Sequence, residues 1–422
     1  MFSFYYFIIR RVRLSILFVR QISTYQTLRS VKYSYYLIIR TKPKILFDKL
    51  LFFLHNFIDM NRKNEKTLSV SEQYNVAKAK KIAIILILLA LVFLFFVVSV
   101  FVGSGTLSFK EVFLAIFNKG SETARLIVRR IRFPRVIAAL IAGGGLAVSG
   151  LVMQTVLKNP LASPTTLGVS NAAVFGANFA IIVVGAGAFH STHGSWLSIS
   201  NPYLVSTFSF LSAIIAAGSI LLLARLKNLN ASAIVLAGVA VSAIFQAGTT
   251  LIQYFASDTQ VASAVYWTFG DLGRASYKTD LIMFIVVAVS TLFFFLKRWD
   301  FSAMSGGLAY AKTLGVNTRF MTIMSLLLAS LITSVTVSFL GIIGFVGLTA
   351  PQFMKRIVGD DYRYLLPSSF LAGALLLLIS DILGRLPIFG TSVPVGVVTS
   401  LIGGPVFLAI LLRRKKNESE NI

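Results

Sequence analysis

Residues 131–170 read IRFPRVIAALIAGGGLAVSGLVMQTVLKNPLASPTTLGVS and contain the features that decide the fold. After Arg135 comes an apolar run of about twenty residues, long enough for one helix to cross about 30 Å of hydrocarbon. Small residues repeat in this run at four-residue spacing, and small residues let helix backbones approach closely within a membrane. We therefore predict a spanning helix that packs against its neighbours through Gly143, Gly144, Gly145 and Gly150.

Similar apolar runs recur along the rest of the chain. The 422 residues are 56% hydrophobic and 13% charged, and the mean hydropathy is +0.81, whereas a soluble domain has about 25% charged residues. A spanning helix satisfies its own backbone hydrogen bonds, and the runs lack the alternating polarity of outer-membrane strands. We predict an all-α polytopic membrane protein with about ten transmembrane helices. The predicted spans are 82–102, 134–157, 165–188, 203–225, 232–254, 279–297, 320–340, 344–357, 366–384 and 395–412.

The Lys and Arg residues indicate the orientation of these spans. The net charge of +25 would suggest nucleic-acid binding in a soluble protein. Here, however, most positive charges fall in loops on one side of the membrane, as they do in cytoplasmic loops. We predict a multi-pass protein of the cytoplasmic (inner) membrane, with both termini in the cytoplasm and no nucleic-acid partner.

One loop departs from this charge pattern. The segment 125–135 lies between the first two predicted spans, hence outside, yet it contains Arg125, Arg129, Arg130, Arg132 and Arg135. An exposed basic patch attracts an acidic partner or ligand. We therefore predict a docking surface there, with contact to lipid phosphates or a solvated helix N-terminal face as the alternatives.

The sequence lacks the motifs of an enzyme. It has no Cys and only three His, and it contains no G-x-x-x-x-G-K-[ST] loop for ATP, no H-E-x-x-H and no G-x-S-x-G. We expect no catalytic residue, metal or cofactor. Ionisable residues inside the spans are few, and Asp381 with Arg385 at i+4 forms the clearest pair. This scarcity argues against an ion-coupled carrier, which usually needs buried acids near the midplane.

The chain ends differ from the spans. Residues 1–59 contain ten Lys or Arg, two Asp and no Glu. We interpret this basic N-terminal extension as dispensable, with a membrane-surface anchor as the alternative reading. Residues 60–81 are predicted to be a basic cytoplasmic lead-in, and residues 415–422 a cytoplasmic tail.

Several stretches together resemble one known family. They are the R-x-P-R opening, glycine-rich span and NPLASPTTLGVS turn of 131–177, YWTFGDLGRASY at 266–277, and the long runs 344–385 and 394–414. From about residue 82 to 414 the chain resembles the FecCD-type permeases of ABC importers. That family includes the vitamin B12 permease and many ferric-siderophore and haem permeases.

The resemblance implies an assembly and roles for particular residues. It implies a dimer with a second permease copy or paralogue around one pathway, two cytoplasmic ABC ATPase subunits, an extracytoplasmic substrate-binding (lipo)protein, and surrounding membrane lipids. The family's arginines that meet acidic residues of the binding protein correspond to Arg132, Arg135 and Arg385. The family's ATPase-coupling helix corresponds to Leu308, Ala309, Tyr310, Ala311, Lys312, Thr313, Leu314 and Gly315.

The function expected from the resemblance is that of a permease subunit, not an enzyme. It would move iron chelates, with ferric siderophores first, by alternating access driven by a separate ATPase. A haem or cobalamin permease of the same family is one alternative. An ion-coupled secondary transporter and a membrane scaffold without transport are alternatives of other classes.

Overall fold

The computed structural model describes residues 69–103, 107–186, 201–226, 231–386 and 392–419. The predicted extension 1–59 and all three histidines lie outside these residues. The chain divides into two compact units, Met1–Ala77 and Lys78–Ile422. The first contributes only the start of one long helix to the described residues, and everything below concerns the second.

Long apolar helices build the second unit, so the predicted all-α polytopic fold is confirmed. Within the described ranges, seven helices are long and apolar enough to cross a membrane. They are α4 (Val70–Phe101), α7 (Phe133–Val156), α9 (Pro202–Leu226), α10 (Ala231–Tyr254), α12 (Tyr277–Leu296), α15 (Thr318–Leu340) and α17 (Tyr362–Arg385).

Three predicted spans fall on helices outside this set of seven. They are α8 (Val169–Asn178) with its π-helical continuation η3 (Phe179–Val183), α16 (Val346–Val358), and α18 (Val395–Ser419). The span predicted from residue 165 begins later because Gly168 takes a φ of +90°, which a helix cannot include. The first span, predicted from 82, continues a helix that begins at Val70 within the predicted lead-in.

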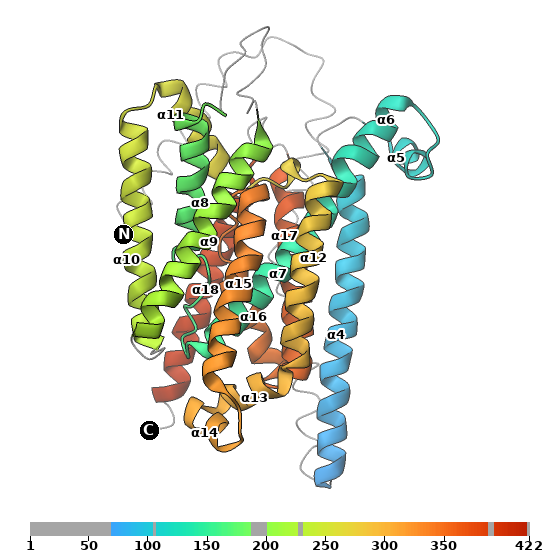
Figure 1. Ribbon diagram of the computed structural model, residues 1–422. Coiled ribbons are helices and arrows are strands. Elements are labelled where there is room, and N and C mark those ends of the chain that lie inside the picture. Colours follow the sequence, from blue (N-terminus) through green and yellow to red (C-terminus); the bar gives the residue numbers. More distant parts are fainter. Residues whose placement is uncertain (1–68, 104–106, 187–200, 227–230, 387–391, 420–422) are drawn as a thin grey trace, which may run out of the picture. The chain divides into compact units, whose positions relative to one another are not determined.

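Short helices gather at the two ends of the long ones (Figure 1). One end carries α5 (Phe109–Ile116), α6 (Glu122–Leu126) and α11 (Asp258–Thr268), and we call it the α6 end. The π-helical η2 (Ile127–Arg132) leads from α6 directly into α7, and η4 (Leu272–Arg274) leads towards α12. The other end carries α13 (Arg298–Gly306) and α14 (Leu308–Thr313), and we call it the α14 end.

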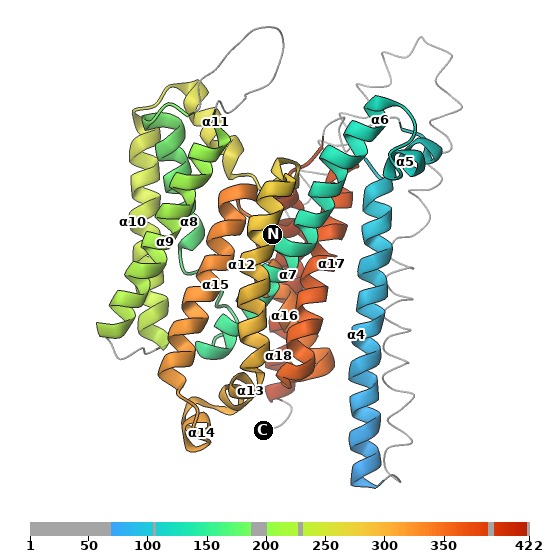
Figure 2. The same cartoon turned by 45° about the vertical axis from the view of Figure 1, so that its right-hand side comes forward.

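Helix α7 lies at the centre of the second unit and packs against α12, α15, α16 and α17 (Figure 2). In its most apolar stretch 89% of the residues are buried, compared with 17% for α4. Glycines bring α7 into backbone contact with two neighbours. A Cβ on Gly143 would lie 2.5 Å from the carbonyl oxygen of Gly373 in α17, and one on Gly150 would overlap the carbonyl oxygen of Gly347 in α16.

The other two predicted packing glycines face side chains. A Cβ on Gly144 would lie 2.4 Å from the ring of Phe370, and one on Gly145 would lie 2.7 Å from Val287. The structure therefore places all four glycines where α7 meets a neighbouring helix, and a larger side chain at any of them would force the helices apart.

The backbone breaks between α15 and α16. Phe345 has a φ of +63°, rare for a bulky residue, and its side chain lies against Gly403 of α18, where a Cβ would be 2.4 Å away. Just before it, the amide of Ile342 donates to the carbonyl of Thr268, 3.2 Å away. The chain therefore turns within residues 341–345, between the predicted spans 320–340 and 344–357.

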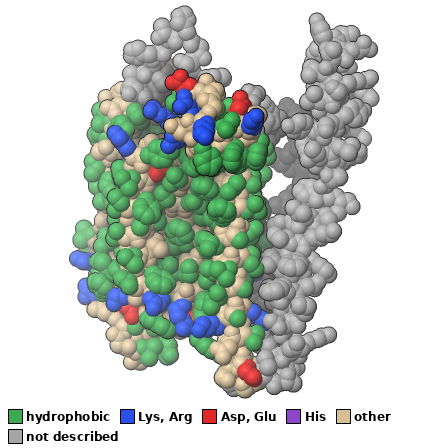
Figure 3. Space-filling view, turned by 90° about the vertical axis from the view of Figure 1, so that its right-hand side faces the viewer, with side chains coloured by type: hydrophobic (Ala, Val, Ile, Leu, Met, Phe, Trp, Pro, Cys, Tyr) green, Lys and Arg blue, Asp and Glu red, His purple; other side chains and the backbone are tan. Residues whose placement is uncertain are grey.

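The surface separates into bands. On the face seen in Figure 3, Lys and Arg side chains gather in two bands, and hydrophobic side chains cover the surface between them. This is the arrangement expected when an apolar belt contacts lipid and charged side chains reach the water on either side.

Candidate functional site

The α6 end holds a buried charged cluster centred on Asp381 of α17. This carboxylate is fully buried. Nε of Arg135 lies 2.7 Å from its Oδ1, and Nη2 of Arg385 lies 2.8 Å from its Oδ2. Arg135 also lies 3.5 Å from Oδ1 of Asp271, in the loop before η4. One carboxylate thus ties α7 to α17 through Arg135 and forms an ion pair with a second buried arginine, Arg385.

Arg385 and a further arginine, Arg132, cap the end of α4. Arg385 donates to the carbonyls of Ser99 and Val102, at 2.9 and 2.6 Å. Arg132 donates to the carbonyls of Val100 and Phe101, both at 3.0 Å. The last carbonyls of a helix have no partner within it and carry partial negative charge, so cations are favourable there.

We call Arg132, Arg135, Arg385 and Asp381 the arginine clamp. Arg132 is only 5% exposed and Arg385 only 6%. The guanidinium groups predicted from the resemblance to meet a binding protein are therefore occupied inside the protein. Their docking role stays a prediction, and the structure gives them a second role, which is to hold α4, α7 and α17 together.

The other arginines of the same segment, of which Arg129 and Arg130 are exposed and Arg125 is half-buried, line a polar pocket. Arg125, Arg129 and Arg130 of α6 and η2 line a pocket of about 490 Å³. Its other lining residues are Asn118, Glu122, Leu126 and Tyr277. Arg129 donates to Oδ1 of Asn118 at 2.8 Å, and the Tyr277 hydroxyl donates to the Arg129 carbonyl at 2.6 Å. We call this the exposed arginine pocket. The basic cluster predicted at 125–135 includes these arginines, whereas the family resemblance predicted docking roles for Arg132 and Arg135 only within that segment.

The loop before α12 is held by a further arginine. Arg274 donates to the carbonyls of Trp267 and Tyr266, 2.7 and 3.0 Å away, at the C-terminal end of α11. Burial lowers the pKa of its guanidinium, and the aromatic rings of the same two residues lie within 6 Å of its Cζ. This fixes the YWTFGDLGR segment at the α6 end.

The α14 end presents the predicted coupling helix to solvent. Tyr310 is 56% exposed and Leu314 57%, whereas Ala311 is fully buried against the bundle. Ala309, Lys312, Thr313 and Gly315 are exposed and Leu308 is half-buried. The segment therefore offers a mixed apolar and polar face on a helix of six residues, while Ala311 and the half-buried Leu308 pack it against the core.

The neighbouring helix α13 anchors this face to the long helices. Phe301 of α13 stacks on Tyr362 of α17, with ring centroids 5.2 Å apart, and the Tyr362 hydroxyl is hydrogen-bonded to Thr155 of α7. Lys158, just after α7, donates to the carbonyl of Ser305 at 2.7 Å. Thus α13 is joined to both α7 and α17 at this end.

Comparison with known proteins assigns the chain to a family. Residues 88–413 match the model of the FecCD transport family. The chain belongs to this family. It is 48% identical to an ABC transporter permease protein of Methanocaldococcus jannaschii, over 83% of this chain and 99% of that protein. It is 32% identical to the hemin transport system permease protein HmuU of Yersinia pestis, over 75% of this chain and 91% of that protein.

A solved structure agrees with this assignment. The FecCD chain aligns with a metal-chelate type ABC transporter in an inward-facing conformation with a TM-score of 0.66 and 25% identity, over 79% of this chain and 99% of the other. The expected permease role is confirmed: this FecCD protein is a transport subunit, and ATP hydrolysis belongs to a separate partner.

One buried acid of this FecCD protein escaped the sequence analysis. Asp280, in the first turn of α12, is 3% exposed, and among the described residues neither of its oxygens has a hydrogen-bond partner. It stands at the edge of a predicted span, after the polar run DLGRASYKT, so nothing distinguished it from a loop residue. In the described part of the chain, no group of three His, Cys, Asp or Glu could hold a metal ion.

Proposed function

We propose that this chain is the permease subunit of an importer for iron chelates, with a ferric siderophore as the first candidate substrate. The names of its relatives support this. Besides the hemin permease, an iron chelatin transport system permease protein of Helicobacter pylori is 33% identical over 71% of this chain. Vitamin B12 permeases of similar identity keep haem or cobalamin as the alternative substrates.

The observation that carries the mechanism is the exposed α14 segment on an anchored α13. An ATPase subunit that holds Tyr310 and Leu314 would move α13 with it. Because α13 is fixed to α7 and α17, that motion would shift packed helices as rigid bodies, which is the usual form of alternating access. We propose that Leu308–Gly315 is the ATPase contact and that the α14 end faces the cytoplasm.

For the α6 end we propose docking of the substrate-binding protein. Arg129 and Arg130 are exposed and supply the positive surface that an acidic partner needs. Arg132, Arg135 and Arg385 then stand behind this surface and keep its shape. A second permease copy or paralogue would complete the pathway, since one such subunit supplies half of the assembly in the family.

Transport in proteoliposomes tests the proposal. The chain, its ATPase and its binding protein are reconstituted, and uptake of a radiolabelled ferric siderophore is followed with and without ATP. Uptake that requires both ATP and the ATPase is the expected result. Uptake that follows a proton gradient in the absence of the ATPase would reject it.

A variant pair tests the coupling contact. Tyr310→Ala with Leu314→Ala removes two exposed side chains, so we expect normal insertion but loss of ATPase co-purification and of uptake. Tyr203→Ala, which removes a tyrosine 64% exposed on α9, is the matched control and should keep both. Normal co-purification of the ATPase with the double variant would contradict the assignment.

Asp280 is the observation that favours the ion-coupled alternative, because carriers of that class use buried acids. Under the importer proposal Asp280→Asn removes a carboxylate that has no partner among the described residues, and ATP-driven uptake should persist. If Asp280→Asn abolishes uptake while the ATPase still co-purifies and hydrolyses ATP, the result favours the ion-coupled carrier over the ATP-driven importer.

A further inference from the structure

An apolar groove of about 700 Å³ opens between α7, α12 and α17. Ile137 and Leu140 of α7 form its floor, Phe284 and Phe295 of α12 one wall, and Pro367 and Phe370 of α17 the other. Phe284 is 55% exposed and Phe295 39%, so the groove is open at the surface. Because all three helices are membrane spans, it opens into the hydrocarbon.

The groove ends at a cationic and aromatic surface near the α14 end. Phe295, in the last turn of α12, belongs to the groove and also lies under the guanidinium of Arg298, whose Cζ is 4.6 Å from the ring centroid. Arg298 lies 5.8 Å from the ring of Trp299, and Arg363 covers the same ring from 4.9 Å. We call Phe295, Arg298, Trp299 and Arg363 the cation–aromatic row.

The charges of this row differ in how they are satisfied. Arg363 forms an ion pair with Asp361 at 2.7 Å. Arg298 donates to the carbonyl of Phe295 at 3.0 Å, and no carboxylate of the described residues pairs with it. Lys81 extends the positive surface, with its Nζ 5.3 Å from the ring of Tyr364. A cation on aromatic rings beside an apolar groove suits a ligand that combines an anionic group with an apolar tail.

We propose that the groove and the cation–aromatic row together bind one anionic phospholipid. An acyl chain occupies the groove, and the phosphate lies against Arg298, with Trp299 at the level of the headgroups. Basic sites between transmembrane helices at one membrane face bind acidic headgroups by this combination of charge and apolar contact, and Trp is favoured at the headgroup level.

The lipid would bear on the centre of the protein. Phe370 and Val287 line the groove on one side and contact Gly144 and Gly145 of α7 on the other. A lipid in the groove would therefore pack behind Phe370 and Val287 and hold them against Gly144 and Gly145, where α7 has no side chain to contribute to the contact. This purpose requires only that the chain lies in a membrane, so it does not depend on which substrate is carried.

Native mass spectrometry of the full chain, extracted from vesicles of equal parts phosphatidylglycerol and phosphatidylcholine, tests the proposal. The wild-type chain should retain one phosphatidylglycerol preferentially. Arg298→Gln should weaken its retention about fivefold, the effect of one basic residue at an anionic surface. Ala288→Phe, which fills the groove from α12, should abolish retention, and Ala288→Leu provides a smaller filling if the first variant inserts poorly.

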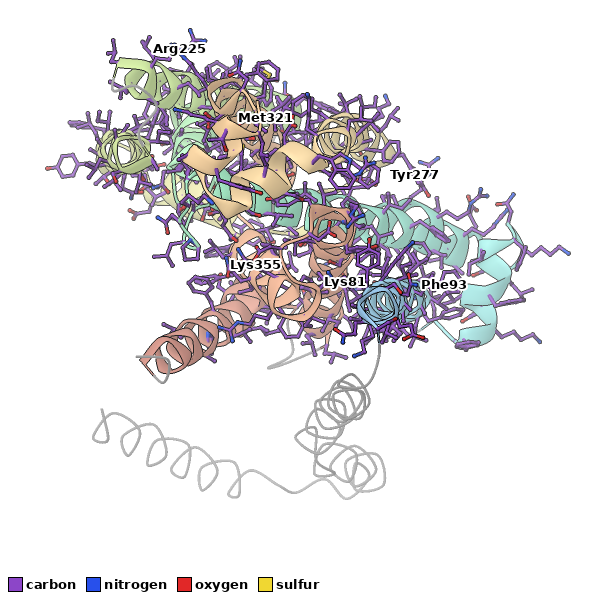
Figure 4. The ribbon with its side chains drawn as sticks, turned by 90° about the horizontal axis from the view of Figure 1, so that it is seen from below. Lys81, Phe93, Arg225, Tyr277, Met321 and Lys355 are labelled. Atoms are coloured by element: carbon purple, nitrogen blue, oxygen red, sulfur yellow. The ribbon has the colours of Figure 1, made fainter. Side chains whose placement is uncertain are left out.

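Two matched controls keep the outcome clear. Arg225→Gln removes an exposed arginine at the end of α9, which Figure 4 shows on the opposite side of the end view from Lys81. Ile285→Phe enlarges an exposed residue of α12 that does not line the groove. Both should retain the lipid as the wild type does. Three results would overturn the proposal. Arg298→Gln could retain phosphatidylglycerol as well as the wild type, or Arg225→Gln could lose as much of the lipid as Arg298→Gln. Alternatively, Ala288→Phe could split a dimer of the chain into monomers, which would show that the groove contacts a second copy of the chain instead of a lipid.

Discussion

The arginine clamp and the cation–aromatic row use arginine in opposite ways. At the α6 end the arginine clamp buries its guanidinium groups and satisfies them with Asp381 and the last carbonyls of α4. At the α14 end Arg298 and Arg363 lie on aromatic faces at the surface. The difference teaches that arginines of one membrane protein can be buried against a carboxylate and helix carbonyls in one cluster and lie on aromatic rings at the surface in another.

The largest expected effect is at the centre of the clamp. Asp381→Ala leaves Arg135 and Arg385 without their buried carboxylate, which should cost about 3–5 kcal/mol of unfolding free energy. The measurement is denaturation of the purified chain in detergent. Asp360→Ala is the control, because Asp360 is 54% exposed and pairs with the exposed Lys355, and it should cost less than about 1 kcal/mol. Similar losses in both would remove the contrast between buried and exposed pairs.

A smaller loss is expected where the clamp meets α4. Arg132→Met keeps an unbranched side chain but removes the hydrogen bonds to Val100 and Phe101, and bonds of this charged kind contribute about 1.5–3 kcal/mol. The loss should also appear as faster hydrogen exchange in the last turn of α4. Arg129→Met removes an exposed arginine from the same segment and serves as the control. If Arg129→Met speeds hydrogen exchange in the last turn of α4 as much as Arg132→Met does, the hydrogen bonds of Arg132 do not specifically stabilise that turn.

The smallest effect on stability is expected in the exposed arginine pocket, although function should change there. Arg129→Glu with Arg130→Glu should alter the unfolding free energy by no more than about 0.5 kcal/mol. Binding of the substrate-binding protein should weaken about tenfold at low salt and much less at high salt, because exposed charges are screened. Binding that is equally tight at low salt would move the docking surface elsewhere.

Hydropathy identified the spans well but could not separate their environments. The predictions 203–225 and 232–254 differ by one residue at most from Pro202–Leu226 and Ala231–Tyr254. Apolar length sets these limits, and length is local information. Burial is not, since α4 and α7 are both strongly apolar, yet one is 17% and the other 89% buried. Only the small residues of α7 pointed to its central position.

The clamp shows why the candidate site was only partly predictable. The pair Asp381 and Arg385 follows from i+4 spacing, and the structure contains it. The partner carbonyls of Arg132, however, belong to residues about thirty positions away, and the contact of Arg135 with Asp381 joins α7 to α17. Such contacts depend on how helices pack, which a single sequence does not specify. Asp280 was missed for a related reason, because its burial depends on neighbours from other helices.

The stack of Phe301 on Tyr362 has a mechanical consequence. Helices α7 and α17 are joined at the α14 end through Tyr362 and Thr155, at mid-length through Gly143 and Gly373, and at the α6 end through Arg135 and Asp381. Two helices joined at three levels move as one rigid body. A displacement of α14 would therefore reach the opposite end of the protein as a tilt of α7 and α17 together, with little bending of either helix.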